Sequence, residues 1–330
     1  MNSPLVSILI PCRNAAPWLR ACLDSAFAQT WPEKEIILVD DGSTDGSLAI
    51  ARAYLARGLR LIEGPSRNAA AARNTALHAA KGQWIQFLDA DDLLAPDKIE
   101  RQVRLAAGQP NIRLMSGEWD RFLTNPNEAR FRPQPNWKDL DPVEFLSLLF
   151  HGGWMMQPGA WLSHRTLLDE AGSWNENITL NDDGEYFARV MLAAGRIYFC
   201  PGARIYYRSL PSGSLSSRSD ARSLQSLFDA TSLIFQNLEK TAGSDTARPI
   251  MAAGWKWLAF ELYPGAPGLS RRAEDASRAL GGSLRPFPAG PTFQALSRLV
   301  GWRAAKRIRH LLSNGGRSQI APPLPCPAPR

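Results

Sequence analysis

Three aspartates, Asp89, Asp91 and Asp92, come directly after the apolar run 84–88. Carboxylates this close repel one another, with Asp41 expected across the same edge, and without a counter-charge one would be partly protonated. A divalent cation removes the conflict, and a site with one or two protein carboxylates suits Mg²⁺ or Mn²⁺ with substrate phosphates completing the shell. The alternative is an exposed acidic turn that caps a helix, but the buried run just before it favours the metal site.

A second acidic turn, Asp40–Asp45, follows the apolar run 35–39. A carboxylate here can accept a hydrogen bond from a nucleobase N–H or a ribose hydroxyl. Ser43 or Asp45 can also cap the next helix, and the two roles are compatible. Arg73 lies on an alanine-rich segment, where it could pair with a diphosphate, support the acidic cluster, or be an ordinary surface arginine.

These residues need a scaffold, and the apolar pattern of the first 90 residues predicts one. Strands alternate with helices: we expect strands at 5–10, 35–39, 59–63 and 84–88, and helices at 17–28, 46–56 and 69–80. Such alternation indicates a mostly parallel, Rossmann-like α/β sheet covered by helices on both faces. Ligands bind beyond the carboxyl ends of the strands in such sheets, which is where both acidic turns fall.

The rest of the chain divides by composition. We expect a first domain at 1–215, a helical extension at 216–313 and a proline-rich, disordered tail at 314–330. The small polar run 209–219 is expected to be mobile. Further helices are expected at 143–150, 164–171, 185–194, 220–240, 247–262 and 292–313, and short strands at 197–200 and 203–207.

Composition excludes several classes of protein. The chain has 330 residues, 45% of them hydrophobic and 21% charged, which is globular rather than fibrous or disordered. We find no run near the roughly 18 apolar residues of a membrane span, and the N-terminus makes a poor secretory signal. The four cysteines form no C-x-x-C pair, so we expect reduced thiols and a cytoplasmic protein.

The net charge of +7 is unevenly distributed. Residues 241–330 hold 13 Lys and Arg against 4 Asp and Glu, whereas the first 240 residues have a small acidic excess. A nucleic-acid role would need the C-terminal segment to act alone, so we expect no nucleic-acid partner. Dinucleotide, P-loop, H-E-x-x-H and G-x-S-x-G motifs are absent, which argues against dehydrogenases, P-loop enzymes, zinc proteases and serine hydrolases.

Four motifs in order carry a family resemblance. They are Val6–Pro11 with Asn14, Val39–Asp45, Ala72–Asn74 and Phe87–Asp92. Together they resemble a family 2 inverting glycosyltransferase of the GT-A fold, over roughly residues 3–210. The resemblance implies transfer of a sugar from a nucleotide-diphosphate donor, most often UDP-linked, to a hydroxyl of a carbohydrate or glycolipid acceptor, in glycan or polysaccharide biosynthesis.

The resemblance also assigns roles at the donor site. It implies that Asp41, with Asp40 beside it, contacts the base or ribose, and that Asp89 contacts the ribose. Asp91, with Asp92 near it, would hold the Mg²⁺ or Mn²⁺ that bridges the diphosphate. The other implied donor-binding residues are Pro11, Arg13, Asn14, Arg73 and Arg208, and Arg13 stands where the family often has an aromatic residue.

Inversion also requires a general base for the acceptor hydroxyl. The family places it in an acidic pair ahead of a helix that bears an arginine. Asp182 and Asp183 with Arg189 match that pattern, and the register from Arg189 makes Asp183 the base. The alternative is that the pair merely caps the helix.

Two features leave alternatives open. Trp154 and Trp161 could stack on the acceptor or belong to the core. The basic helix 292–313 could lie on an anionic membrane surface, making the protein peripheral to the cytoplasmic membrane, or could be a solvated helix packed on the catalytic domain. The competing functions are a nucleotide-sugar-binding module without catalysis and a magnesium-dependent nucleotidyltransferase.

Overall fold

The computed structural model describes residues 3–64, 67–209 and 220–314. The chain clusters into two compact units, Met1–Pro142 with Met155–Pro211, and Val143–Trp154 with Ser212–Arg330. Segment 143–154 therefore groups with the second unit, although the boundary expected from the sequence places it in the first domain. Residues 210–219 of the expected mobile run, residues 315–330 of the expected disordered tail and Cys326 lie outside the described residues.

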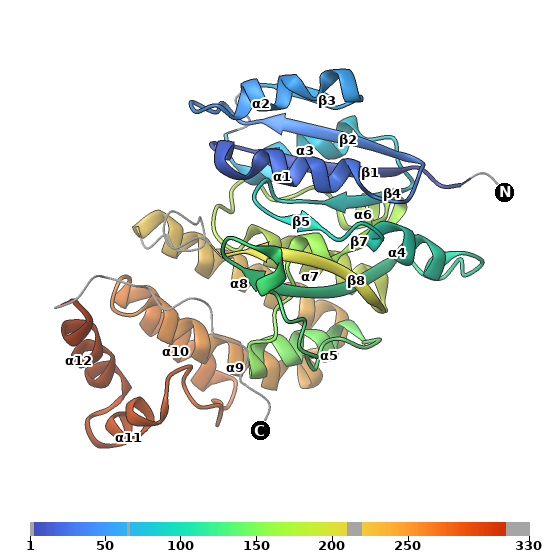
Figure 1. Cartoon of the computed structure of the whole chain (residues 1–330). Helices are drawn as coiled ribbons and strands as arrows, with labels where there is room; N and C mark the ends of the chain where they lie inside the picture. Colours follow the sequence, from blue (N-terminus) through green and yellow to red (C-terminus); the bar gives the residue numbers. More distant parts are fainter. Residues whose placement is uncertain (1–2, 65–66, 210–219, 315–330) are drawn as a thin grey trace. The chain divides into compact units, whose positions relative to one another are not determined.

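The first unit is built on a single sheet, in which eight strands are described (Figure 1). Their order across the sheet is β3-β2-β1-β4-β7-β6-β8-β5. The strands are β1 (Val6–Cys12), β2 (Lys34–Asp40), β3 (Arg60–Glu63), β4 (Trp84–Phe87), β5 (Leu93–Leu94), β6 (Leu114–Phe122), β7 (Leu162–His164) and β8 (Tyr198–Arg208).

The N-terminal half of the sheet is parallel, because β3, β2, β1 and β4 all run in one direction. Helices α1 (Ala16–Phe27), α2 (Ser47–Ala53) and α3 (Ala69–Ala79) connect these strands. Residues 6–10 of β1 are all buried, as expected for a central strand covered on both faces. The α/β fold with a largely parallel sheet and flanking helices, predicted from strand and helix alternation, is confirmed.

The other half of the sheet contains both parallel and antiparallel strand pairs, and its strands are harder to predict from the sequence. Strands β6 and β7 were not predicted, and the two strands expected at 197–200 and 203–207 form the single long strand β8. A register shift between Ser116 and Glu118 accommodates the join. Gly117 lies there so close to β8 that a Cβ would stand 2.2 Å from the carbonyl oxygen of Ala203, so this position requires glycine.

Three further helices complete the first unit: α4 (Lys98–Ala106), α6 (Arg165–Ala171) and α7 (Asp182–Ala194). Helix α7 begins three residues before the expected start, after Asn181 in the left-handed region with φ 64°. Asp182 and Asp183 therefore lie inside the first helical turn. Single helical turns lie at Leu55–Arg57, Pro126–Glu128 and Pro158–Ala160.

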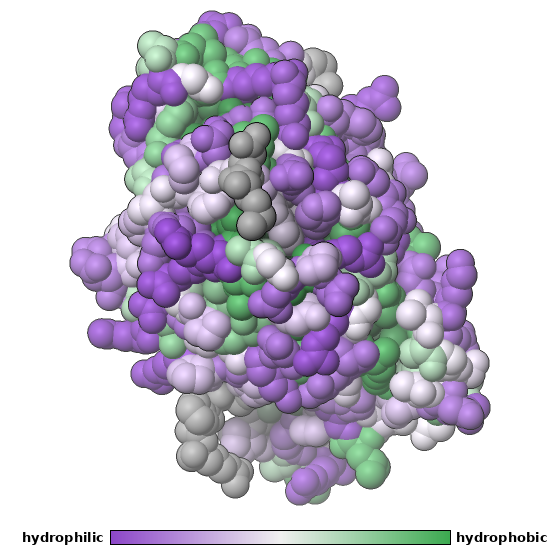
Figure 2. Space-filling view, turned by 90° about the vertical axis from the view of Figure 1, so that its right-hand side faces the viewer, coloured by the Kyte–Doolittle hydropathy of each residue, from purple (hydrophilic) through white to green (hydrophobic). Residues whose placement is uncertain are grey.

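Helix α4 has two different faces. Its outer face carries the ion pairs Arg101–Asp97 and Arg104–Glu100. The face of the molecule seen in Figure 2 is largely hydrophilic, with smaller apolar areas between. Its inner face buries Lys98 completely, with Nζ donating to Gln86 Oε1 at 2.5 Å and to Gln102 Oε1 at 2.7 Å. Burial lowers the pKa of Lys98 to about 7, since these amide oxygens carry no charge.

We expect this lysine to make stability rise with pH. Between pH 7 and 9 an unfolded Lys98 binds a proton that the folded side chain has lost, so the free energy of unfolding increases by up to about 1.4 kcal/mol per pH unit. Chemical denaturation of the protein and of Lys98→Met at several pH values measures the difference. The exposed Lys81→Met is the matched control, and an equal slope in wild type and Lys98→Met would contradict the assignment.

The second unit is helical in the part that is described. It contains α5 (Pro142–Ser147), the wide turn Leu148–Gly152, α8 (Ala221–Ala242), α9 (Ser244–Leu262), α10 (Pro267–Ala279), α11 (Pro291–Val300) and α12 (Trp302–Asn314). Gly254 of α9 lets Phe235 and Phe150 approach, because a Cβ there would lie 2.3 Å from the Phe235 ring and 2.8 Å from that of Phe150.

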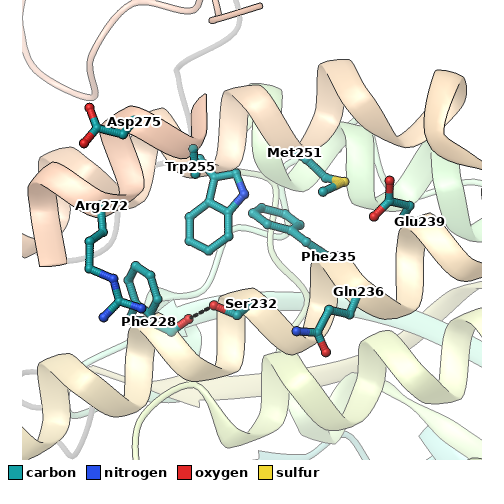
Figure 3. A pocket seen from close by; sticks show the side chains of 10 residues that line it. Phe228, Ser232, Phe235, Gln236, Glu239, Met251, Trp255, Arg272 and Asp275 are labelled. Carbon is teal, nitrogen blue, oxygen red and sulfur yellow. Dashed lines mark hydrogen bonds between the residues drawn. The ribbon is translucent and has the colours of Figure 1, made fainter. Parts of the chain in front are cut away.

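A cavity of about 490 Å³ lies among α8, α9 and α10 (Figure 3). The rings of Phe228, Phe235 and Trp255 form much of its lining, and the Arg272 guanidinium lies 4.6 Å from the centre of the Phe228 ring. All three rings are at least nine-tenths buried. They therefore serve chiefly to pack the three helices together.

The single helix expected at 292–313 is two helices, α11 and α12, which we call the C-terminal hairpin (residues 291–314). Gly301 separates them with φ +78°, a conformation that a helix cannot contain. Phe293 and Ala305 of the hairpin pack with Phe260 in a small core of their own. Among the described residues, we find no helix with the length and apolar content to cross a membrane.

Candidate active site

The carboxyl ends of β2, β1 and β4 meet at one edge of the sheet, because these strands are parallel neighbours. Two acidic turns, after β2 and after β4, lie at this edge. We call it the aspartate edge, and its members are Asp40, Asp41, Asp89, Asp91 and Asp92. The sheet thus brings together carboxylates that are about fifty residues apart in the sequence.

The turns after β1 and β2 are tied to each other. Asn14 Oδ1 accepts from the N–H of Thr44 at 2.8 Å, and the Ser43 hydroxyl accepts from the N–H of Asn14 at 3.0 Å. Asn14 adopts φ 51°, which asparagine tolerates better than most residues. Its side chain therefore shapes the turn, while Pro11 at the end of β1 stays partly exposed.

Asp40 and Asp41 are both buried, at 3% and 5% exposure. Asp40 Oδ2 accepts from the N–H of Ser43 at 3.0 Å, while its Oδ1 is buried without a hydrogen-bond partner in the described part of the chain. The exposed Arg13 lies 3.6 Å from Asp41 Oδ2. The N-cap of α2 is Gly46, so neither Ser43 nor Asp45 takes that position. Asp45 instead accepts from the N–H groups of Ser47 and Ala16, the first residues of α2 and α1. Asp40 therefore has an acceptor oxygen left for a donor group from a ligand.

Arg73 joins the aspartate edge to α7. Its side chain is 8% exposed, and its two terminal nitrogens donate to Asp89 Oδ1 and to Asp182 Oδ2, each at 2.8 Å. The guanidinium also lies 4.5 Å from the ring centre of Trp174. Of the three roles considered for Arg73, the structure assigns it support of the acidic cluster.

The neighbouring Asn74 makes a second connection that sequence reasoning missed. Its side chain donates to the carbonyl of Trp174 and to Glu176, and accepts from the N–H of Trp174 at 2.8 Å. Adjacent residues of α3 thus hold both the loop before α7 and the first turn of α7. Asn74 is in the Ala72–Asn74 motif, but its partners lie about 100 residues away and no local pattern indicates them.

The carboxylates after β4 have unequal surroundings. Asp91 is partly exposed, and burial followed by repulsion from Asp89 raises its pKa to about 6. Asp92 is fully buried, and burial followed by repulsion from Asp91 raises its pKa well above the usual range. A cation beside Asp91 would relieve the repulsion between Asp91 and Asp89, whereas the Asp92 side chain is out of reach of solvent.

Both oxygens of Asp92 are already in use. Oδ1 accepts from the N–H of Arg208 at 2.8 Å, and Oδ2 accepts from the side-chain amide of the fully buried Gln157. The expectation that Asp92 holds a metal ion does not fit this arrangement, because the side chain is fully buried and each oxygen already accepts a hydrogen bond from the protein. Asp92 instead fixes the end of β8. Sequence reasoning missed Gln157, which no motif marks.

Arg208 lies at the end of β8, next to the acidic turn. Its Nε donates to the carbonyl of Asp91 at 2.8 Å and one terminal nitrogen donates to the carbonyl of Leu123 at 3.0 Å. The side chain is mostly buried and lies over the ring of Phe122 at 4.3 Å. The structure thus brings Arg208 to the aspartate edge, where it holds the backbone of the Asp91 turn.

Asp183 follows Asp182 in the first turn of α7, where carboxylates are stabilised by the helix dipole. Burial, then repulsion from Asp182, raises the pKa of Asp183 to about 6, and the nearby Arg73 opposes the rise. Further along, Glu185 pairs with Arg189 at 2.7 Å, and Arg189 also donates to the carbonyls of Ala171 and Ser173. Arg189 therefore anchors α7 and takes no part at the acidic pair itself.

The two tryptophans expected near the acceptor differ. Trp161 is 2% exposed and stacks on Phe187 at 5.4 Å, so the core alternative holds for it. Trp154 is partly exposed and belongs to the second unit. In the described ranges we find no group of three or more His, Cys, Asp or Glu side chains arranged to hold a metal ion.

The model of the "Glycosyl transferase family 2" matches residues 7–171, half of the chain. A curated relative, an uncharacterized glycosyltransferase of Haemophilus influenzae, is 41% identical over 106 residues, which are 31% of this chain and 42% of that protein. A Bacillus subtilis glycosyltransferase, at 36% identity over 114 residues, is matched over 33% of its length. The chain thus spans about a third to two fifths of these relatives.

Solved structures share the fold. Staphylococcus aureus TarS 1–349 in complex with UDP-GlcNAc matches with a TM-score of 0.70 at 18% identity, covering 93% of this chain and 92% of that one. The mannosyltransferase PcManGT from Pyrobaculum calidifontis, in complex with GDP-Man and Mn²⁺, matches with a TM-score of 0.58 at 21% identity, over 97% and 89% of the two chains. At identities this low, the similarity shows that the fold is shared.

Proposed function

The chain belongs to glycosyl transferase family 2, and from that premise we propose that it moves a sugar from a nucleotide-diphosphate donor, a UDP-sugar, to an acceptor hydroxyl with inversion. One observation carries the proposal. Buried Arg73 pairs with both Asp89, at the aspartate edge, and Asp182, beside the proposed base. A donor at that edge would therefore have its sugar near Asp183.

The residues of the aspartate edge support a nucleotide donor. The unpartnered, buried Oδ1 of Asp40 suits an N–H of the base, and we propose that Asp41 and Asp89 contact the base and ribose. Pro11 and Arg13 would line the base pocket, with Asn14 shaping its turn. In support, TarS is solved with UDP and with UDP-GlcNAc, and PcManGT with GDP-Man.

The proposed reaction is a single displacement at the anomeric carbon. Asp183 accepts the proton of the acceptor hydroxyl while the acceptor oxygen forms a bond to that carbon. The bond from the carbon to the diphosphate oxygen breaks, and the nucleoside diphosphate leaves with the electron pair. A carboxylate whose pKa is about 6 is ionised at neutral pH and more basic than an ordinary aspartate.

The carboxylate of Asp91 fits a divalent cation, Mg²⁺ or Mn²⁺. It is partly exposed, and burial followed by repulsion from Asp89 raises its pKa, which is the situation that a cation relieves. Such an ion would neutralise the charge of the departing diphosphate. Asp92 and Gln157 would keep the Asp91 turn in place from behind.

We expect Asp91→Asn to weaken Mn²⁺ binding by at least roughly tenfold, as loss even of a supporting residue at a metal site does. Titration of free Mn²⁺ by its paramagnetic resonance signal measures this without any turnover. UDP binding in the presence of Mn²⁺ should fall in parallel. Asp97→Asn, beyond the turn on the same segment, is the control, and unchanged Mn²⁺ uptake by Asp91→Asn would refute the assignment.

Product analysis separates the alternatives. A glycosyltransferase releases nucleoside diphosphate, a nucleotidyltransferase releases pyrophosphate, and a sugar-binding module releases neither. A thermal-shift screen of nucleotide sugars with and without Mn²⁺ would identify the donor first. For the acceptor we propose a carbohydrate or glycolipid, with Trp154 as a candidate contact, in glycan or polysaccharide biosynthesis.

A further inference from the structure

Exposed apolar side chains are concentrated on the C-terminal hairpin. Leu299 and Val300 end α11 and are 83% and 47% exposed, and α12 adds Ile308, Leu311 and Leu312 at 39%, 73% and 78%. Elsewhere in the described ranges, the large apolar side chains exposed to this degree are Leu55, Leu123 and Leu284. We call the five side chains of the hairpin its outer face. Single exposed leucines are ordinary, but a group on adjacent helices is not.

The outer face adjoins the face that folds the hairpin but is left exposed. On α12 the folding face is formed by Trp302, Ala305 and Lys306, which contact Phe260: Ala305 is fully buried, and Lys306 Nζ lies 4.0 Å from the centre of the Phe260 ring. Ile308, Leu311 and Leu312 are spaced three and four residues apart, so they share one stripe of the helix. Ala305 lies three residues before Ile308 and seven before Leu312, so the stripe adjoins the folding face, yet its three large side chains remain exposed.

Charge on the hairpin is of one sign. Residues 291–314 contain Arg298, Arg303, Lys306, Arg307 and Arg309 and no aspartate or glutamate. Arg303 pairs with Glu274 at 2.5 Å. Arg298, Arg307 and Arg309 are exposed, although the Arg307 guanidinium lies 5.4 Å from the centre of the Tyr263 ring and Arg309 is near Glu261. These exposed cations next to the apolar stripe can meet an outside partner's anions.

We propose that the outer face of the hairpin docks on an anionic lipid surface, with the leucines inserted at the headgroup boundary and the arginines on lipid phosphates. An exposed apolar stripe flanked by arginines is the composition of a helix that lies in a membrane interface. A second copy of this chain would bring two faces of the same positive charge together. A nucleic acid would use the arginines but leave the leucines in water. The proposal is independent of the sugar-transfer reaction.

The test is vesicle flotation of the full chain, with phosphatidylcholine alone or mixed with phosphatidylglycerol. We expect binding to the mixed vesicles, weaker binding to phosphatidylcholine, and loss of binding as salt rises. Leu311→Ser with Leu312→Ser should lower the partition constant by at least about tenfold. Arg298→Gln with Arg307→Gln should lower binding to mixed vesicles only.

The matched control is Leu55→Ser with Leu123→Ser, which removes two leucines elsewhere that are 49% and 55% exposed and should leave vesicle binding unchanged. Equal losses in both leucine pairs, or no binding to mixed vesicles, would overturn the proposal. Light scattering without lipid tests the rival occupant: a dimer that Leu311→Ser with Leu312→Ser dissociates would assign the face to a second copy. Donor binding by the same variants reports separately on the proposed function.

Discussion

Replacing Asp183 by asparagine is expected to lower the rate of sugar transfer by roughly 10²–10⁴-fold, the contribution of a positioned general base. The amide cannot take the acceptor's proton, while the size and position of the side chain are preserved. Donor binding should be nearly unchanged, because the aspartate edge is intact and Arg73 still pairs with Asp89 and Asp182. The measurement is the turnover rate beside the dissociation constant of the donor.

The pH dependence of the wild-type enzyme tests the same assignment. Burial and Asp182 raise the pKa of Asp183 to about 6, so the base is protonated and inactive below pH 6 and ionised above it. kcat/KM should therefore rise with pH through about 6 and then level off. The control is Asp169→Asn on the exposed side of α6, which should behave as wild type. An Asp183→Asn enzyme with more than a tenth of wild-type turnover would remove Asp183 from the role of base.

The second large effect is on stability. Arg73→Met should reduce the free energy of unfolding by about 3–5 kcal/mol, because it leaves Asp89 and Asp182 without their shared, buried counter-charge. The contact with Trp174 is partly kept by the methionine chain. The loss should be smaller at acidic pH, where protonation relieves the repulsion among the carboxylates, and should grow as the pH rises toward neutrality.

Denaturant titration at pH 5 and pH 7 measures this prediction. Arg113→Met is the matched control: Arg113 pairs with Glu170 at 2.7 Å, but that pair is 30% and 51% exposed, so its loss should cost about 0–1 kcal/mol. Arg73→Lys keeps the charge but cannot bridge both partners in the same way, and should fall between wild type and Arg73→Met. Equal effects at positions 73 and 113 would show that the Arg73 ion pairs contribute no more to stability than an exposed pair does.

Local patterns in the sequence were sufficient for the parallel half of the sheet. Each of β1 to β4 is a short apolar run, and acidic residues follow β2 and β4, so both the edge and its aspartates could be predicted. The start of α7 was placed near Glu185, three residues late, because a left-handed residue such as Asn181 has no reliable signal in the sequence. Strand β7, only three residues long, was missed for lack of periodicity.

The supporting residues could not be predicted, for a physical reason. Gln157 and Asn74 act through hydrogen bonds to groups 65 to 102 residues away, and their value depends on burial that only the folded chain provides. Trp161 and Trp154 could not be told apart from the sequence. In the structure Trp161 is buried and stacks on Phe187, whereas Trp154 is partly exposed. The roles of Asp183, Asp91 and the donor-binding residues remain predictions that the experiments above test.

The grouping of segment 143–154 with the second unit has a consequence for how the chain can be truncated. Phe150 is 5% exposed and packs on Phe235 of α8, with ring centres 4.8 Å apart. Ending the chain at residue 211 would leave that ring without its neighbour and open to aggregation. The second unit is therefore discontinuous in the sequence, and a truncated or transplanted version keeps this core only if segment 143–154 and the later helices are kept together.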